Sequence, residues 1–332
     1  MLIEFAPEIL STKDNLNKFM YLYNLCFLHR RYDFFIDLTE VLNSPIYESL
    51  SFEDKEVIEA SFNVQATRNA TVDFLITNEE IKENYVLNLD EAYAYLTQPL
   101  YIVLENSYND RHFVNALIDN FSNKGKKIRR HLNQRFISYL NGGGCTNIKS
   151  VLEEKIEAFN DLPREGSFYF RGFVLIDSDS EYEGDIKQSR TDLKNYLDGN
   201  RIKYHFLTKR EMENYLPEEV YESIADNQEY IAAYKRLTPI QKDYLDIENG
   251  FIPNVNYEAH YKNEIKDLFY TVSPADKNIF RADTLNIFNF KVEFPKLFKN
   301  AAVTQTSLQK RIAHQTNSNE LGDILDKINN LL

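Results

Sequence analysis

Residues 100–110 have the sequence LYIVLENSYND, and this stretch decides the fold that we expect. Its first half, LYIVL, is an unbroken apolar and aromatic run, which is typical of a strand buried on both faces of a parallel sheet. Its second half starts at Glu105 and stays polar as far as Asp110. In open α/β sheets, ligands bind beyond the carboxyl ends of the strands, so this junction is the first place to look for a site.

The same alternation of strand and helix continues after residue 110. Further strands are predicted at 135–140 (RFISYL), 170–176 (FRGFVLI) and 202–207 (IKYHFL), with helices at 111–121, 146–159 and 185–197. Strands that alternate with helices form right-handed crossovers and a parallel sheet that is covered on both faces. We therefore expect an α/β fold with a four-stranded parallel sheet in residues 98–217.

The distribution of glycine separates this region from its two flanks. Nine of the ten glycines lie between Gly125 and Gly250, and none lies in the first 124 residues. Because helix interiors exclude glycine, residues 1–97 are expected to be mostly helical, with residues 72–78 (VDFLITN) open to interpretation as a short strand. Residues 218–332 are likewise expected to form a mostly helical C-terminal region.

Acidic residues follow the predicted strands at corresponding places. Glu105 ends the first strand, Asn141 and three glycines end the second, and Asp177 and Asp179 end the third. Carboxylates crowded together repel one another unless a divalent cation neutralises them. Oxygen ligands at this density suit Mg²⁺ or Mn²⁺, so the pattern predicts metal-assisted chemistry on a phosphate.

The overall composition limits the class of protein. The formal net charge is −13, which disfavours binding of nucleic acid by bulk charge. Two cysteines in 332 residues exclude a disulfide framework and fit a reducing cytoplasm. The chain has no apolar run long enough to span a bilayer and no secretion signal at its start, so a cytoplasmic location without membrane contact is expected.

With these residues in view, the chain resembles the Toprim family, which includes bacterial primases, topoisomerases and the overcoming-lysogenization-defect nucleases. The resemblance covers residues 98–217 and rests on Glu105, the glycine loop and the Asp177-x-Asp179 pair. The later segment HFLTKREMENYLP (205–217) is similar to a Glu-Asn-Tyr signature of Toprim nucleases in anti-phage defence systems.

Carried over to this chain, the resemblance implies catalysis and metal coordination by Glu105, Asp177 and Asp179, with Glu213 as a further ligand. The family pattern places glycine after the glutamate and an acid four residues later. This chain has Asn106 and Asn109 in those places, and Asp110 comes one residue later. Either Asn109 or Asp110 would then complete the site. Lys242 and Lys266 are alternatives for the lysine that steadies transition-state charge in many relatives.

The function implied is an endonuclease that uses two Mg²⁺ or Mn²⁺ ions to hydrolyse DNA or RNA, transfer RNA included. Family relatives are often encoded beside an ABC-type or AAA-type ATPase, so such a partner is expected, and self-association is left open. A tyrosine nucleophile and a Rossmann-type binding protein are disfavoured, because no cleavage domain fits the length and no GxGxxG follows the first strand. A non-catalytic Toprim-like scaffold is the alternative function.

A basic run lies away from the acidic residues. KGKKIRRHLNQR (124–135) contains six lysine and arginine residues and no acid. We expect it to connect the first helix to the second strand, at the edge of the sheet opposite the carboxylates. A solvated loop, a partner surface and a distal contact with nucleic acid are all compatible with this place.

Overall fold

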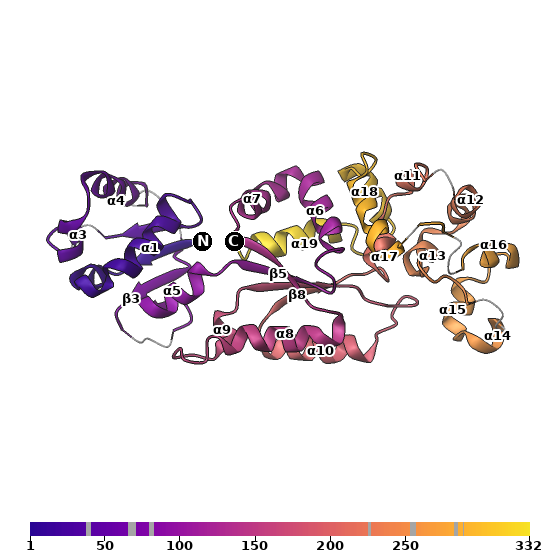
Figure 1. Ribbon diagram of the computed structural model, residues 1–332, viewed down its shortest axis with the longest axis horizontal. Helices are drawn as coiled ribbons and strands as arrows, with labels where there is room; N and C mark the ends of the chain where they lie inside the picture. The colour runs from indigo at the N-terminus through magenta and orange to yellow at the C-terminus, as the bar shows by residue number, and fades with distance from the viewer. Residues whose placement is uncertain are drawn as a thin grey trace.

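The computed structural model describes residues 1–332 except 38–40, 66–70, 80–82, 225–226, 253–256, 282–284 and 288. Figure 1 shows three neighbouring parts along the long axis: a small N-terminal sheet with its helices, a central sheet between helical layers, and a group of C-terminal helices. In the described part of the chain, no helix has both the length and the apolar character needed to cross a lipid bilayer.

The central part is the α/β fold that the sequence predicts. Its four strands are parallel and lie in the order β6-β5-β7-β8. The strands are β5 (Leu100–Leu104), β6 (Ile137–Asn141), β7 (Gly172–Ile176) and β8 (Lys203–Phe206). The helices between them are α6 (Arg111–Asn120), α7 (Ser122–Asn133), α8 (Cys145–Glu157), α9 (Gly166–Tyr169) and α10 (Gln188–Gly199).

Two helical layers cover this sheet. In Figure 1, α8 and α10 lie along one face, and α6 and α7 lie along the other together with the C-terminal helix α19 (Glu320–Asn329). Every residue of β7 is buried, as expected for a central strand with helices on both faces.

The basic run 124–135 is a helix and not the connecting loop that the sequence suggested. It forms most of α7, which packs against α6 and α19. Gly125 allows this approach, because a Cβ atom there would lie 1.9 Å from the carbonyl oxygen of Ile118. Buried Ile128 supplies the apolar side of the helix, and its basic residues occupy the other side.

The N-terminal part contains a second parallel sheet. The expectation of a mostly helical region omitted it, apart from the strand suggested in residues 72–78. Its strands have four residues or fewer, too short for periodicity to distinguish them from buried turns of helix. They lie in the order β2-β1-β3-β4: β1 (Leu2–Phe5), β2 (Asp33–Ile36), β3 (Phe74–Thr77) and β4 (Val86–Asn88).

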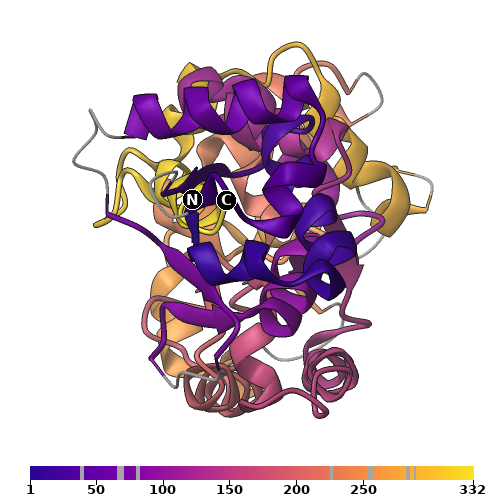
Figure 2. The same cartoon turned by 90° about the vertical axis from the view of Figure 1, so that its left-hand side faces the viewer.

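Helices pack against this small sheet and supply its separate hydrophobic core. Figure 2 faces this end of the molecule and shows the N-terminal elements in front of the rest of the chain. The helices are α1 (Leu16–Phe27), α3 (Pro45–Ser49), α4 (Phe52–Gln65) and α5 (Leu89–Thr97), with the 3₁₀ turns η1 (Pro7–Ser11) and η2 (Lys13–Asn15).

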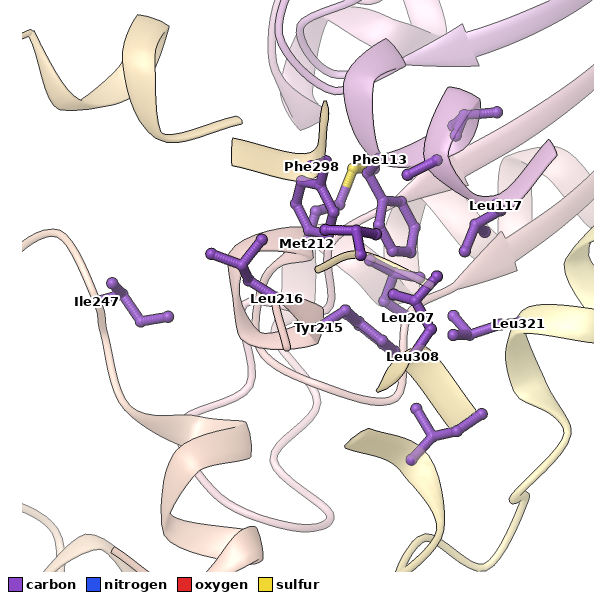
Figure 3. Close-up of a cluster of buried hydrophobic side chains, with 14 of the residues drawn as sticks. Phe113, Leu117, Leu207, Met212, Tyr215, Leu216, Ile247, Phe298, Leu308 and Leu321 are labelled. Carbon is purple, nitrogen blue, oxygen red and sulfur yellow. The ribbon is translucent and has the colours of Figure 1, made fainter. Parts of the chain in front are cut away.

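The C-terminal region is helical in its described residues and shares one hydrophobic core with the central sheet. Figure 3 shows this core, in which the ring of Phe113 of α6 packs against the rings of Tyr215 and Phe298. The elements are η3 (Met212–Tyr215), α11 (Glu218–Tyr221), α12 (Gln228–Arg236), α13 (Pro239–Tyr244), α14 (Tyr257–His260), α15 (Asn263–Leu268), α16 (Pro274–Ile279), α17 (Phe290–Glu293), η4 (Phe294–Lys299), α18 (Gln305–Ile312) and α19. The C-terminal helices are therefore part of the framework that holds the ends of the central strands.

Candidate metal centre

An acidic pocket lies at the carboxyl end of the central sheet. It has a volume of about 410 Å³ and is open to solvent. All six residues that the sequence suggested as metal ligands line it. Its lining includes Glu105, Asn109, Asp110, Asp177, Asp179, Glu211, Glu213 and Glu248, together with Gly143, Gly144 and Lys291.

The first wall of the pocket is the turn after β5. The backbone N–H of Asn106 donates to Asp110 Oδ2 over 2.8 Å, which closes the turn and fixes that carboxylate. Asn109 is 6% exposed, and its Oδ1 atom has no hydrogen-bond partner among the described residues. A buried amide oxygen without a partner is costly unless something else binds it. The structure thus brings both alternatives, Asn109 and Asp110, to the pocket.

The second wall is the turn after β7, which carries Asp177 and Asp179. Asp177 Oδ1 accepts a hydrogen bond from the backbone N–H of Met212 over 2.9 Å. Asp179 has a left-handed backbone (φ +53°), and its N–H donates to the carbonyl oxygen of Arg210 over 2.9 Å. This conformation is strained for a residue other than glycine, and the hydrogen bond to Arg210, in the segment after β8, stabilises it.

The third wall follows β8 and contains Glu211 and Glu213. The backbone N–H of Glu211 donates to Asn214 Oδ1 over 3.0 Å, as the first half of a reciprocal cap on η3. The side chain of Asn214 is fully buried and donates to the carbonyl oxygens of Lys242 and Leu245. Met212 and Tyr215 extend into the shared core in Figure 3 and hold the short turn in place.

The crowding of these carboxylates changes their acidity. Burial and the nearby charges of Glu213 and Glu105 raise the pKa of Asp110 to about 7. Burial, Glu213 and Asp246 raise the pKa of Glu211 to about 8. Burial also raises the pKa values of Glu105, Asp177 and Glu213. The pocket therefore holds more negative charge than it can keep ionised at neutral pH without a cation.

One cation of α10 contacts carboxylates in two walls of the acidic pocket. The guanidinium of Arg190 lies 2.6 Å from Glu105 Oε1 and 2.5 Å from Asp179 Oδ2. Its side chain is 5% exposed. Arg190 therefore ties together the two walls that follow β5 and β7 and neutralises part of their charge.

The donor set fits a hard divalent cation, although its geometry is not closed around one. Carboxylate and amide oxygens are the ligands that Mg²⁺ and Mn²⁺ prefer, and the unpaired oxygen of Asn109 offers a further donor. Among the described residues, however, no group of three or more histidine, cysteine, aspartate or glutamate side chains is arranged to hold a metal ion. Binding an ion would require these side chains to move inward, with Arg190 giving up part of its contact.

The suggested lysines lie elsewhere. Lys242 is buried and pairs with Glu218 over 2.6 Å, and Lys266 donates to the carbonyl oxygen of Glu258 over 3.0 Å. The lysine that does line the pocket is Lys291, which lies 3.6 Å from Glu248. The position of Lys291 in the pocket depends on how the C-terminal region packs against the sheet. It could therefore not be predicted from spacing along the chain.

Sequence reasoning also missed Glu211, Glu248 and Arg190. Glu211 could have been found, because it lies two residues before Glu213 in the segment that was already singled out. No comparable signal marks Glu248 or Arg190. Glu248 belongs to the C-terminal region, and Arg190 lies within the predicted helix 185–197.

Comparison with known proteins adds no relative to this geometry. No protein-family model, no curated protein and no solved structure gives a significant match to the chain.

Proposed function

We propose that this chain is a metal-dependent phosphodiesterase of the Toprim type, an endonuclease acting on DNA or RNA. The observation that carries the proposal is the convergence on one solvent-open pocket of carboxylates that follow β5, β7 and β8, three strands that are adjacent in the central sheet. Metal-dependent nucleases need such a site, since the phosphodiester and its attacking water must meet a concentrated positive charge.

The residues that would hold Mg²⁺ or Mn²⁺ are Glu105, Asn109, Asp110, Asp177, Asp179 and Glu213, with Glu211 added by the structure. This number of oxygens is enough for two ions. When bound, such ions lower the pKa of a water molecule toward neutrality and stabilise the attacking and leaving oxygens of a phosphodiester.

The chain itself contributes positioning and charge. The bond from the Met212 N–H fixes one oxygen of Asp177 and leaves the other available to a ligand. Arg190 offsets the repulsion between the carboxylates of Glu105 and Asp179, because it contacts both of them. Lys291 brings a positive charge to the lining of the pocket. A phosphate that enters the pocket would meet Lys291 beside the carboxylates.

The biological setting of the proposal comes from the family resemblance alone. It is anti-phage defence in the cytoplasm, with an ABC-type or AAA-type ATPase as partner and controller. An acidic chain with large helical surfaces outside the pocket is compatible with control by a protein partner.

The test is cleavage by the purified chain, alone and together with any ATPase encoded beside it. We expect plasmid DNA or transfer RNA to be cut with Mg²⁺ or Mn²⁺ and to stay intact in EDTA. Glu105→Gln and Asp177→Asn should abolish cutting and retain the fold, whereas Glu154→Gln, an exposed acid of α8, should cut normally. Cleavage that persists in both pocket variants would refute the proposed site.

Arg190 also favours the second candidate, a Toprim-like scaffold that performs no chemistry. In that case the ion pairs of Arg190 with Glu105 and Asp179 are never replaced by a metal ion. The scaffold predicts no cleavage with any partner or metal, and a Glu105→Gln variant that still assembles with the partner.

A further inference from the structure

A strip of basic side chains borders the acidic pocket on one side. It runs along the start of α6 and along the segment formed by α17 and η4. We call it the α6–η4 strip. Its basic members are Arg111, Lys291, Lys296 and Lys299, together with Arg129 of the neighbouring helix α7, and the aromatic Tyr108 is counted with them.

The strip begins inside the pocket and continues away from it. Lys291 lines the pocket, and Arg111 directly follows the pocket residue Asp110. From Lys291 the chain continues into η4, which packs along α6. The ring centres of Phe113 in α6 and Phe298 in η4 lie 5.4 Å apart. The strip ends at a hollow of about 510 Å³ that Arg129 and Lys299 line with His112.

The cations converge on a common region. Lys296 and Lys299 lie in η4, which packs along α6, and Arg111 is the first residue of α6. Carboxylates face three of the five cations: Lys296 lies 2.6 Å from Glu293, Lys291 lies 3.6 Å from Glu248, and Arg129 pairs with Asp119. In the described part of the chain, no ion pair with a carboxylate is found for Arg111 or Lys299. Exposed pairs of this kind contribute about 0–1 kcal/mol, so a phosphate can displace them.

An aromatic ring is exposed at the end of the strip that borders the pocket. Tyr108 is 57% exposed, and the guanidinium carbon of Arg111 lies 4.8 Å from the centre of its ring. An exposed ring beside backbone-binding cations is the combination by which proteins hold unpaired nucleotides, because a base can stack on the ring. Tyr108 immediately precedes Asn109 and therefore stands at the edge of the carboxylates.

We propose that the α6–η4 strip binds a single-stranded segment of the polynucleotide, with its phosphates along Lys291, Lys296 and Lys299 and a base stacked on Tyr108. The proposal rests on the proposed nuclease function and adds a direction to it: the strand leaves the acidic pocket toward α6 and η4. It also explains how a chain with net charge −13 can hold a polyanion, since the cations gather where the strand runs.

The test measures binding in EDTA, so that no cleavage takes place and a failure of the nuclease activity cannot be mistaken for a failure of the strip. Fluorescence anisotropy of a labelled single-stranded DNA or RNA oligonucleotide is followed over a range of salt concentrations. In the variant Lys291→Gln/Lys296→Gln/Lys299→Gln, the slope of log affinity against log salt should fall by about 2, since each contact with a single strand contributes about 0.7.

A matched control changes the same charge elsewhere. Lys149→Gln/Lys155→Gln/Lys194→Gln removes three lysines of α8 and α10, on the opposite face of the central sheet. This control should keep the wild-type slope. An equal decrease in both triple variants, an unchanged slope in the strip variant, or no binding by the wild-type chain at low salt would each overturn the proposal.

A second variant tests the stacking. Tyr108→Ala should weaken the binding of the single strand about 5- to 100-fold, and Tyr108→Phe should restore it, because base stacking needs the ring and not the hydroxyl. Binding of a duplex of the same length should not change in Tyr108→Ala. Equal single-strand affinity in Tyr108→Ala and wild type would contradict the role of the ring.

Discussion

Arg190 lies 2.6 Å from the carboxylate of Glu105, although the two residues are 85 positions apart and belong to different units of the α/β fold. The same guanidinium also contacts Asp179. One buried cation thus holds together the ends of β5 and β7, where the metal ligands are expected.

Replacing this cation should expose the repulsion that it offsets. We expect Arg190→Met to lower the free energy of unfolding by about 1–3 kcal/mol in EDTA, because a charged partner of two carboxylates is lost. Saturating Mn²⁺ should recover more stability in this variant than in the wild-type chain, since the ion then supplies the missing charge. Urea unfolding with and without Mn²⁺ measures both quantities. An Arg190→Met chain that gains no more from Mn²⁺ than the wild type would argue against competition between Arg190 and a metal.

The raised pKa of Glu211 predicts a pH dependence of stability. Its pKa is about 8 in the folded chain, well above the ordinary value of 4.5 for a glutamate, so the folded state binds the proton more tightly than the unfolded state. The stabilising effect of this proton is complete below pH 4.5 and is lost as the pH rises through about 8.

Comparison with Glu211→Gln isolates this effect from other titrating groups. Without metal, the variant should gain stability relative to wild type as the pH rises from 5 to 8.5, by on the order of 2 kcal/mol, because a partly exposed carboxylate is screened by water. Thermal or urea unfolding at the two pH values checks it. A difference between the two chains that does not change with pH would show that Glu211 titrates normally.

Buried Lys209 joins the third wall of the pocket to the C-terminal helices. Its side chain is fully buried, pairs with Asp243 and donates to the carbonyl oxygen of Arg311 over 2.9 Å. We expect Lys209→Met to lower the free energy of unfolding by about 3 kcal/mol, because Asp243 loses one of its buried partners. The exposed pair of Lys310 and Glu219 is the control, and Lys310→Ala should cost about 0–1 kcal/mol. Equal losses in the two variants would contradict the importance assigned to burial.

Gly125 tests the contact between α6 and α7. A Cβ atom at this position would lie 1.9 Å from the carbonyl oxygen of Ile118, and backbone cannot move aside as a side chain can. Gly125→Ala should therefore destabilise the chain by about 1–3 kcal/mol through overpacking. Gly199→Ala, at the end of α10 with no atom within 4 Å of the added Cβ, should cost little. If the two alanine variants melt at the same temperature, the close contact that we assign between α6 and α7 at Gly125 is wrong.

The central sheet could be predicted because its strands lie in apolar runs that alternate with amphipathic helices. β5 covers the predicted range 100–104 without change, β7 and β8 lie inside their predicted ranges, and β6 ends one residue beyond its predicted range. The N-terminal sheet could not, because four short strands carry too little pattern. α7 was misinterpreted because its many charges hid a narrow buried side, which is formed by Gly125, Ile128, His131 and the half-buried Leu132.

The ligands suggested for the site share one pocket because the carboxyl ends of parallel strands meet at one edge of a sheet. Glu248 and Lys291 could not be predicted. Glu248 follows the short helix α13, which packs against η3, and Lys291 lies in the short helix α17, which packs against η4, so their places depend on tertiary packing.

The central claim is that the acidic pocket binds divalent cations through deprotonated carboxylates. Electron paramagnetic resonance of free Mn²⁺ measures this directly, without need of a substrate or a partner. The account predicts that the wild-type chain binds Mn²⁺, and more tightly at pH 8 than at pH 6, because Asp110 and Glu211 must first lose their protons. Binding should be lost in Asp177→Asn and retained in Glu154→Gln. A wild-type chain that leaves all added Mn²⁺ free at pH 8, or an Asp177→Asn chain that binds as well as wild type, would contradict the account.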